Sequence, residues 1–136
     1  MRVIKFVVLL SALLLAATLL LEEVLQMYQK NMLRDNPKAL TLLEDEANKG
    51  NINAAFLLAT AYKNGKLGDV DIKKSIHWYK VAAHHQDPDA MLMIGWMYYK
   101  EPTNLEANLK KARYWFKKAA SHGVEEAIEM LELLHR

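Results

Sequence analysis

Five histidines are the residues of this 136-residue sequence best suited to bind a metal ion or to transfer a proton. His77 and His84 are seven residues apart and would share one face of a helix, whereas the adjacent His84 and His85 would point in different directions. Zinc needs a third or fourth ligand, and the nearest acids, Asp87 and Asp89, follow the expected end of that helix. The sequence also has no HExxH pattern. We therefore predict no metal site and no cofactor.

The motifs of nucleophilic catalysis are missing as well. The serines are Ser11, Ser75 and Ser121, and none lies in a G-x-S-x-G turn. Gly65 and Gly68 flank a turn that lacks the lysine and hydroxyl spacing of a phosphate-binding loop. Cysteine is absent, which excludes disulfide frameworks, thiol enzymes and most zinc and iron–sulfur sites. We predict that the protein is not an enzyme and has no small-molecule substrate. Turnover that depended on His77 or His84 would be the argument for an enzyme.

The charge balance argues against nucleic acid as a partner. The sequence has 18 basic and 16 acidic residues, but Arg2 and Lys5 lie at the start of an apolar N-terminal run. The remaining residues, 22–136, carry sixteen charges of each sign and are neutral overall. Binding to a phosphate backbone requires a basic surface, so we expect no nucleic-acid binding.

The apolar N-terminal run is long enough to cross a membrane. Counted from Val3 it has nineteen residues, which as a helix reach about 28 Å, close to the roughly 30 Å of a hydrocarbon core. A cleaved signal peptide usually ends in small residues at the cleavage site, but here Ala16, Ala17 and Thr18 are followed by three leucines. We favour an uncleaved signal anchor over residues 1–21 and keep a cleaved signal peptide as the alternative.

The flanking charges predict the orientation of this segment. Arg2 and Lys5 precede the span and Glu22 and Glu23 follow it, so the N-terminus should stay in the cytoplasm. The rest of the chain would then be exported. In a bacterium this means an inner-membrane anchor with the C-terminal domain in the periplasm, or a periplasmic or secreted protein if the segment is cleaved.

The sequence beyond the apolar run repeats itself, which indicates stacked structural units. Residues 73–85 (KKSIHWYKVAAHH) match residues 110–122 (KKARYWFKKAASH) at an offset of 37. Residues 54–62 recur 36 positions later, and a weaker copy at residues 39–47 recurs 73 positions later. Each unit is therefore expected to contain two helices joined by a turn.

The first helix of each unit shows one buried face at i, i+4, i+7 and i+8 spacing. These positions are Ala54, Leu58, Ala61 and Tyr62 in one unit, and Ala90, Ile94, Met97 and Tyr98 in the next. Gly95 takes the place of Ala59. Because glycine costs roughly 1 kcal/mol inside a helix, Gly95 suggests the close approach of a neighbouring helix.

The expected helix ends carry capping residues. Asp71 and Asn108 should cap second helices, with Asp35 in register in the weaker copy. Asp87 followed by Pro88 is typical of an N-cap with proline in the first helical position. Left-handed residues are expected after the second helices at Gly50, Gln86 and Gly123.

Together these patterns resemble the Sel1-like repeat, a relative of the tetratricopeptide repeat with an α/α unit of about 36 residues, the offset found here. The match covers about residues 36–136: two near-complete units, half a unit before them, and a first helix from Val124 to Leu134 after them. The positions that carry it are Tyr62, Asp71, Trp78, Ala83, Tyr98, Trp115, Ala120 and Gly123. Residues 100–107 (KEPTNLEA) depart from the pattern, because their turn lacks glycine and is one residue longer.

The resemblance implies an α/α solenoid of helix-turn-helix repeats over residues 36–136. With the N-terminal transmembrane or signal helix that the apolar run predicts before it, the expected fold is all-α. A single helix pair cannot bury its apolar face. Trp78 and Trp115 are therefore expected between the helices of adjacent units. Residues 22–35 form a link that either continues the membrane helix as a degenerate first helix, which we favour, or lies on the membrane surface.

A candidate protein-binding groove lies on the first helices, which usually line the concave side of a repeat solenoid. Its residues are Phe56, Thr60, Lys63, Leu92, Trp96 and Tyr99. Trp96 aligns with Thr60, so the repeat itself does not require an aromatic side chain at this position, and interface cores are rich in aromatic residues. The alternative is that Trp96 fills a void against the anchor-proximal or the terminal helix.

The function that follows from the resemblance is binding of another protein, without catalysis. We predict a membrane-tethered, exported scaffold or adaptor whose membrane contact is made by residues 3–21. The alternative is a periplasmic immunity or inhibitor protein that neutralises a toxic effector, a role in which exported Sel1-like proteins are found. An inhibitor should bind one partner very tightly, whereas a scaffold should bind several partners with modest affinity.

Overall fold

A computed structural model describes residues 1–101 and 105–135, without the side chain of Ala17. Within these residues every regular element is an α-helix. In chain order the helices are α1 (Arg2–Gln29), α2 (Pro37–Asn48), α3 (Ile52–Lys63), α4 (Ile72–His84), α5 (Pro88–Lys100), α6 (Leu105–Ser121) and α7 (Glu125–Leu134). The predicted all-α fold is confirmed.

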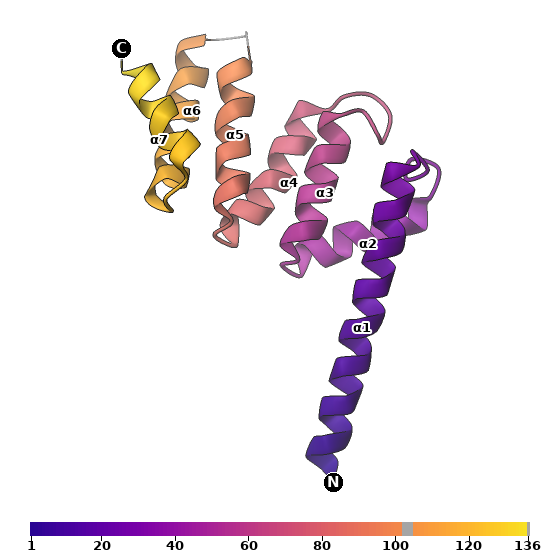
Figure 1. Ribbon diagram of the computed structural model, residues 1–136. Helices are drawn as coiled ribbons and strands as arrows, with labels where there is room; N and C mark the ends of the chain where they lie inside the picture. Colours follow the sequence, from indigo (N-terminus) through magenta and orange to yellow (C-terminus); the bar gives the residue numbers. More distant parts are fainter. Residues whose placement is uncertain (102–104, 136) are drawn as a thin grey trace.

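The helices after α1 form a row of antiparallel neighbours (Figure 1). α3 pairs with α4 and α5 pairs with α6, while α4 packs against α5 and joins the two pairs. α7 follows as a further first helix packed on α6. This arrangement is the predicted α/α solenoid, in which each pair buries its apolar side against the next.

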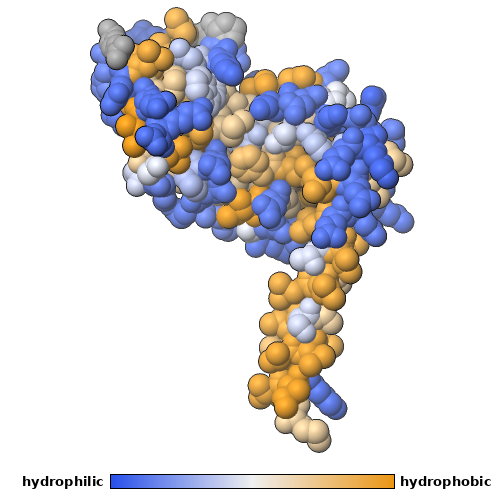
Figure 2. Space-filling model, viewed as in Figure 1, coloured by the Kyte–Doolittle hydropathy of each residue, from blue (hydrophilic) through white to orange (hydrophobic). Residues whose placement is uncertain are grey.

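α1 is one continuous helix that both projects from the solenoid and packs on it. Its 28 residues give a length of about 42 Å. Figure 2 shows the projecting part as an almost wholly hydrophobic stalk, and its large apolar side chains up to Leu20 are exposed. Val24, nearer the end of the helix, is buried, and this end packs against α2 and α3. The link after residue 21 therefore continues the stalk helix as far as Gln29.

Small side chains allow the solenoid helices to approach one another closely. Most of the buried core consists of alanine, including Ala59 of α3. At the matching place in α5, a methyl group on Gly95 would lie 2.6 Å from Cε1 of Phe116 and 2.7 Å from its Cδ1. Phe116 is fully buried in α6. The close approach expected at Gly95 is thus confirmed, and its cause is the Phe116 ring.

Two of the predicted N-caps are confirmed and two are wrong. Asp71 accepts a hydrogen bond from the backbone N–H of Lys74 at 2.9 Å, and Asp87 accepts one from Ala90 at 2.8 Å. Asn36, rather than Asp35, caps α2, because the Asn36 side chain accepts the Ala39 N–H at 3.1 Å. Asn108 is not a cap, since α6 already begins at Leu105 and buries Asn108 in its second turn.

The joints between units have the predicted backbone conformation. Gly50, Gln86 and Gly123 have φ angles of 99°, 65° and 83°, all in the left-handed region. The His85 ring lies against Gly50, where an added Cβ would meet its Cε1 at 3.0 Å. The different turn expected at residues 100–107 falls partly on residues 102–104, which lie outside the described residues.

The two repeat tryptophans have different surroundings. Trp78 is buried, whereas Trp115 is half-buried, with the amine of Lys118 5.3 Å from its ring centroid. Among the other signature positions, Ala83 is buried and Ala120 is half-buried.

We expect Gly95→Ala to lower the free energy of unfolding by about 1 kcal/mol. Alanine is the better helix former by roughly 1 kcal/mol, but overpacking of a core typically costs 1–3 kcal/mol, and here the new methyl group would overlap the Phe116 ring. The measurement is urea unfolding of the full chain in an uncharged detergent, followed by circular dichroism. The double variant with Phe116→Leu is the control, because loss of the ring should remove the penalty of the Gly95 substitution. Equal or higher stability of Gly95→Ala would contradict the close approach.

Candidate functional site

All six residues of the candidate groove are half-buried on α3 and α5. They do not line one continuous hollow. Phe56 and Thr60 line a hollow of about 560 Å³ that also includes residues of α1, which we call the α1 hollow. Lys63 and Trp96 line another of about 530 Å³ that reaches α7, which we call the α7 hollow. Tyr99 contacts Trp96, and Leu92 lines neither hollow.

Trp96 is held firmly although it is only half-buried. Its Nε1 donates a hydrogen bond of 2.7 Å to Oε1 of Glu126 on α7. Its ring packs edge-to-face on Tyr99 and on Phe116, with centroids 5.6 and 5.7 Å away. The amine of Lys100 lies 5.2 Å from the ring centroid, a cation–π contact. The exposed part of the indole is therefore presented to the α7 hollow in a fixed orientation.

The corresponding place in the preceding unit is built differently. Thr60 and the hydroxyl of Tyr79 share a hydrogen bond of 3.1 Å, and Phe56 packs edge-to-face on Tyr79 at 4.9 Å. Burial raises the pKa of Tyr79 above its ordinary value, and the hydrogen bond with Thr60 opposes this shift. Phe116 is the equivalent of Tyr79 and has no hydroxyl, and Trp96 occupies the place of Thr60.

Tyr79 and Phe116 are site residues that the sequence reasoning missed. Each lies beneath the groove and orients the side chain above it. The signal was present in the repeat, because two positions change together: threonine is matched with tyrosine in one unit and tryptophan with phenylalanine in the next.

The end of α1 supplies a second set of missed residues. After α1, the backbone N–H of Asn31 donates to the carbonyl oxygen of Tyr28, and that of Met32 donates to the carbonyl oxygen of Met27. The end of α3 has the same pattern, in which the N–H groups of Gly65 and Lys66 donate to the carbonyl oxygens of Tyr62 and Ala61. Asn31 has a φ of 58°, close to the 69° of Gly65. The two helix ends are thus equivalent at an offset of 34, which the 36- and 37-residue offsets hid. Glu22 of α1, equivalent to Phe56 at this offset, lines the α1 hollow.

The described part of the chain shows no cluster of side chains typical of a metal site. No group of three or more histidine or acidic side chains is placed to hold a metal ion there. His77 and His84 are both exposed on α4. Every buried side-chain nitrogen or oxygen atom within the described residues has a hydrogen-bond partner.

The comparisons with known proteins agree with this architecture. The Sel1 repeat model matches residues 52–87 and 88–124. The structure is similar to the crystal structure of a Sel1 repeat protein from Oxalobacter formigenes, with a TM-score of 0.58 and 28% sequence identity. That likeness covers 79% of this chain and 44% of the other, so this chain spans less than half the length of that protein. No curated protein matches the sequence. Two matched repeats together cover more than half of the chain, and the protein belongs to the Sel1 repeat family.

Proposed function

We propose that this protein is a membrane-tethered, exported scaffold or adaptor that binds another protein through the candidate groove. Sel1 repeats are commonly involved in protein–protein interaction and are generally non-enzymatic. The proposal adds the surface, the tether and the cell compartment to that general role.

The single observation that carries the proposal is the fixed, half-buried indole of Trp96 beside the α7 hollow. A side chain that is already ordered loses little conformational entropy when a partner covers it. Tryptophan is also the residue type that most often contributes a large share of the binding free energy at protein interfaces. Met93, which lines the same hollow, is flexible enough to adapt to the shape of a partner.

The tether rests on the composition of α1. It is long and apolar enough to cross a membrane, a property that signal sequences near an N-terminus share. One feature favours retention of the segment: the apolar run and the part of α1 that packs on the solenoid form one continuous helix. The basic residues Arg2 and Lys5 at the start of this helix favour the orientation with the N-terminus in the cytoplasm.

We expect Trp96→Ala to weaken partner binding roughly 30-fold, the effect of losing about 2 kcal/mol at an interface hot spot. The partner is first isolated by pull-down with the wild-type chain, and its affinity for each variant is then measured by biolayer interferometry. Tyr114→Ala is the matched control, because Tyr114 is an exposed aromatic residue on α6, away from the groove.

Circular dichroism would show that both variants keep their helix content. Undiminished binding by Trp96→Ala would remove the groove from the proposal. One partner held with very high affinity would favour the inhibitor role over the scaffold.

The orientation is testable because the natural chain has no cysteine. We expect a membrane-impermeant maleimide to label Asp69→Cys in intact spheroplasts, because Asp69 lies in the exposed loop between α3 and α4. Val3→Cys should be labelled only after the membrane is opened. Protection of Asp69→Cys would contradict export, and loss of the Val3→Cys label from the mature chain would show that the segment is cleaved.

A further inference from the structure

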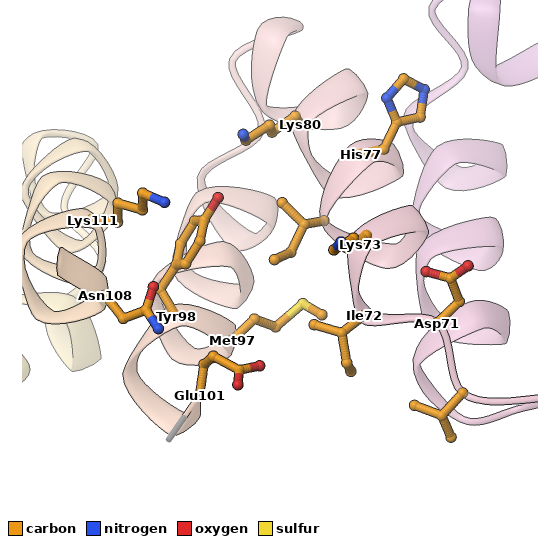
Figure 3. Close-up of a pocket in the computed structure, with 12 residues that line it drawn as sticks. Asp71, Ile72, Lys73, His77, Lys80, Met97, Tyr98, Glu101, Asn108 and Lys111 are labelled. Atoms are coloured by element: carbon orange, nitrogen blue, oxygen red, sulfur yellow. The ribbon is translucent and has the colours of Figure 1, made fainter. Parts of the chain in front are cut away.

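A third hollow lies between the second helices of adjacent units, α4 and α6 (Figure 3). It has a volume of about 710 Å³ and lies at the start of α4, the end of α5 and the first turns of α6. It adjoins the α7 hollow, with which it shares Ile72, Met97 and Glu101. We call it the α4–α6 cleft.

The α4–α6 cleft combines an apolar floor with a basic wall. Ile76 and Met97 supply apolar surface, while the lysines Lys80 and Lys111 extend toward the hydroxyl of Tyr98 (Figure 3). Both acids lie apart from the amines of these two lysines: Figure 3 places Asp71 across the cleft from Lys111, and Glu101 below Tyr98 and Met97.

Asp71 is moreover already engaged. It accepts the N–H of Lys74 at 2.9 Å and lies 3.9 Å from the Lys74 amine. Its charge is therefore partly balanced by a lysine that does not line the cleft.

The basic character of the α4–α6 cleft becomes clear when it is compared with the equivalent junction one repeat earlier, between α2 and α4. There Lys74 lies over the Tyr62 ring at 5.1 Å, as Lys111 lies over the Tyr98 ring at 5.2 Å. Burial raises the pKa of the Tyr62 hydroxyl at this earlier junction, and the negative charge of Glu44 on α2 raises it further, so Glu44 lies near enough to influence the site. The earlier junction therefore places an acid near its lysine.

In the later junction Glu44 is replaced by a lysine. The repeat offsets place Lys80 at the position of Glu44 and Lys111 at the position of Lys74, so the later cleft has two lysines where the earlier junction has one acid and one lysine. Two like charges at one concave site repel each other, and an anion bound between them relieves that repulsion.

The position of the cleft favours a protein over a lipid headgroup. The start of α4 and the end of α5 lie at the end of the solenoid opposite the side from which the stalk of α1 projects (Figure 1). Headgroups of a membrane entered by that stalk would lie on the other side. The floor formed by Ile76 and Met97 also favours a ligand with apolar side chains beside its carboxylates.

We propose that the α4–α6 cleft binds an acidic segment of a partner protein, with carboxylates facing Lys80 and Lys111 and an apolar side chain on Ile76 and Met97. This goes beyond the proposed function, because the cleft is a second surface that does not require Trp96.

The test uses the full chain in an uncharged detergent and a fluorescein-labelled octapeptide of alternating glutamate and leucine, with binding followed by fluorescence anisotropy. Lys80→Glu should weaken binding at least about fivefold, because it removes one attraction and adds one repulsion. Lys80→Arg should retain binding. The matched control is Lys117→Glu, which makes the same change of charge at the repeat-equivalent position outside the cleft, and it should bind like the wild type.

Equal weakening by Lys80→Glu and Lys117→Glu would overturn the proposal, since it would reveal only a general effect of net charge. Absence of peptide binding by the wild type would overturn it as well. Displacement of the peptide by millimolar inorganic phosphate, or by vesicles rich in phosphatidylglycerol, would instead assign the cleft to a small anion or a lipid. Trp96→Ala should keep its affinity for the peptide. A loss there would place the peptide in the groove, so failure of this proposal and failure of the proposed function give different results.

Discussion

Close packing of helices through alanine and glycine is the contact on which the rest of this structure depends. Alanine makes up most of the buried core, and at Gly95 even a methyl group would meet the Phe116 ring. Helices that approach so closely leave room for few large side chains between them, and the large rings that are buried, such as Tyr79 and Phe116, lie against the small residues of the neighbouring helix or beneath the groove.

The second constraint is that α1 belongs to two structures at once. Its first part is an exposed apolar stalk, and its last part ends in the same backbone turn as α3 and packs on α2 and α3. Because the tether continues as the first helix of the array, no flexible linker separates the apolar stalk from the solenoid. In a membrane the solenoid would therefore be held at a nearly fixed distance and orientation, with the α1 hollow next to the bilayer surface.

The two faces of the solenoid offer different chemistry from one repeated sequence. The first helices present aromatic and thioether side chains around Trp96, whereas α4 and α6 present Lys80 and Lys111 around Tyr98. Both depend on positions at which the copies of the repeat differ: one copy has Thr60 where the next has Trp96, and one has Glu44 where the next has Lys80. The core positions that the repeats share hold the stack together, so the surface positions of each unit are free to differ.

Local patterns in the sequence determined the helices, their pairing into repeats and most of their ends, because helical periodicity and capping act over only a few residues. Two predicted caps were wrong: Asp35 was predicted where Asn36 caps α2, and Asn108 was predicted as a cap although α6 already begins at Leu105. Both errors concern helix ends, where the path of the chain into the helix selects the cap. Only the tertiary structure divided the groove into two hollows and showed which side chains of α1 line one of them. It also created the α4–α6 cleft. Such features depend on how close neighbouring helices lie and which side chains they bring together, and no repeat offset contains that information.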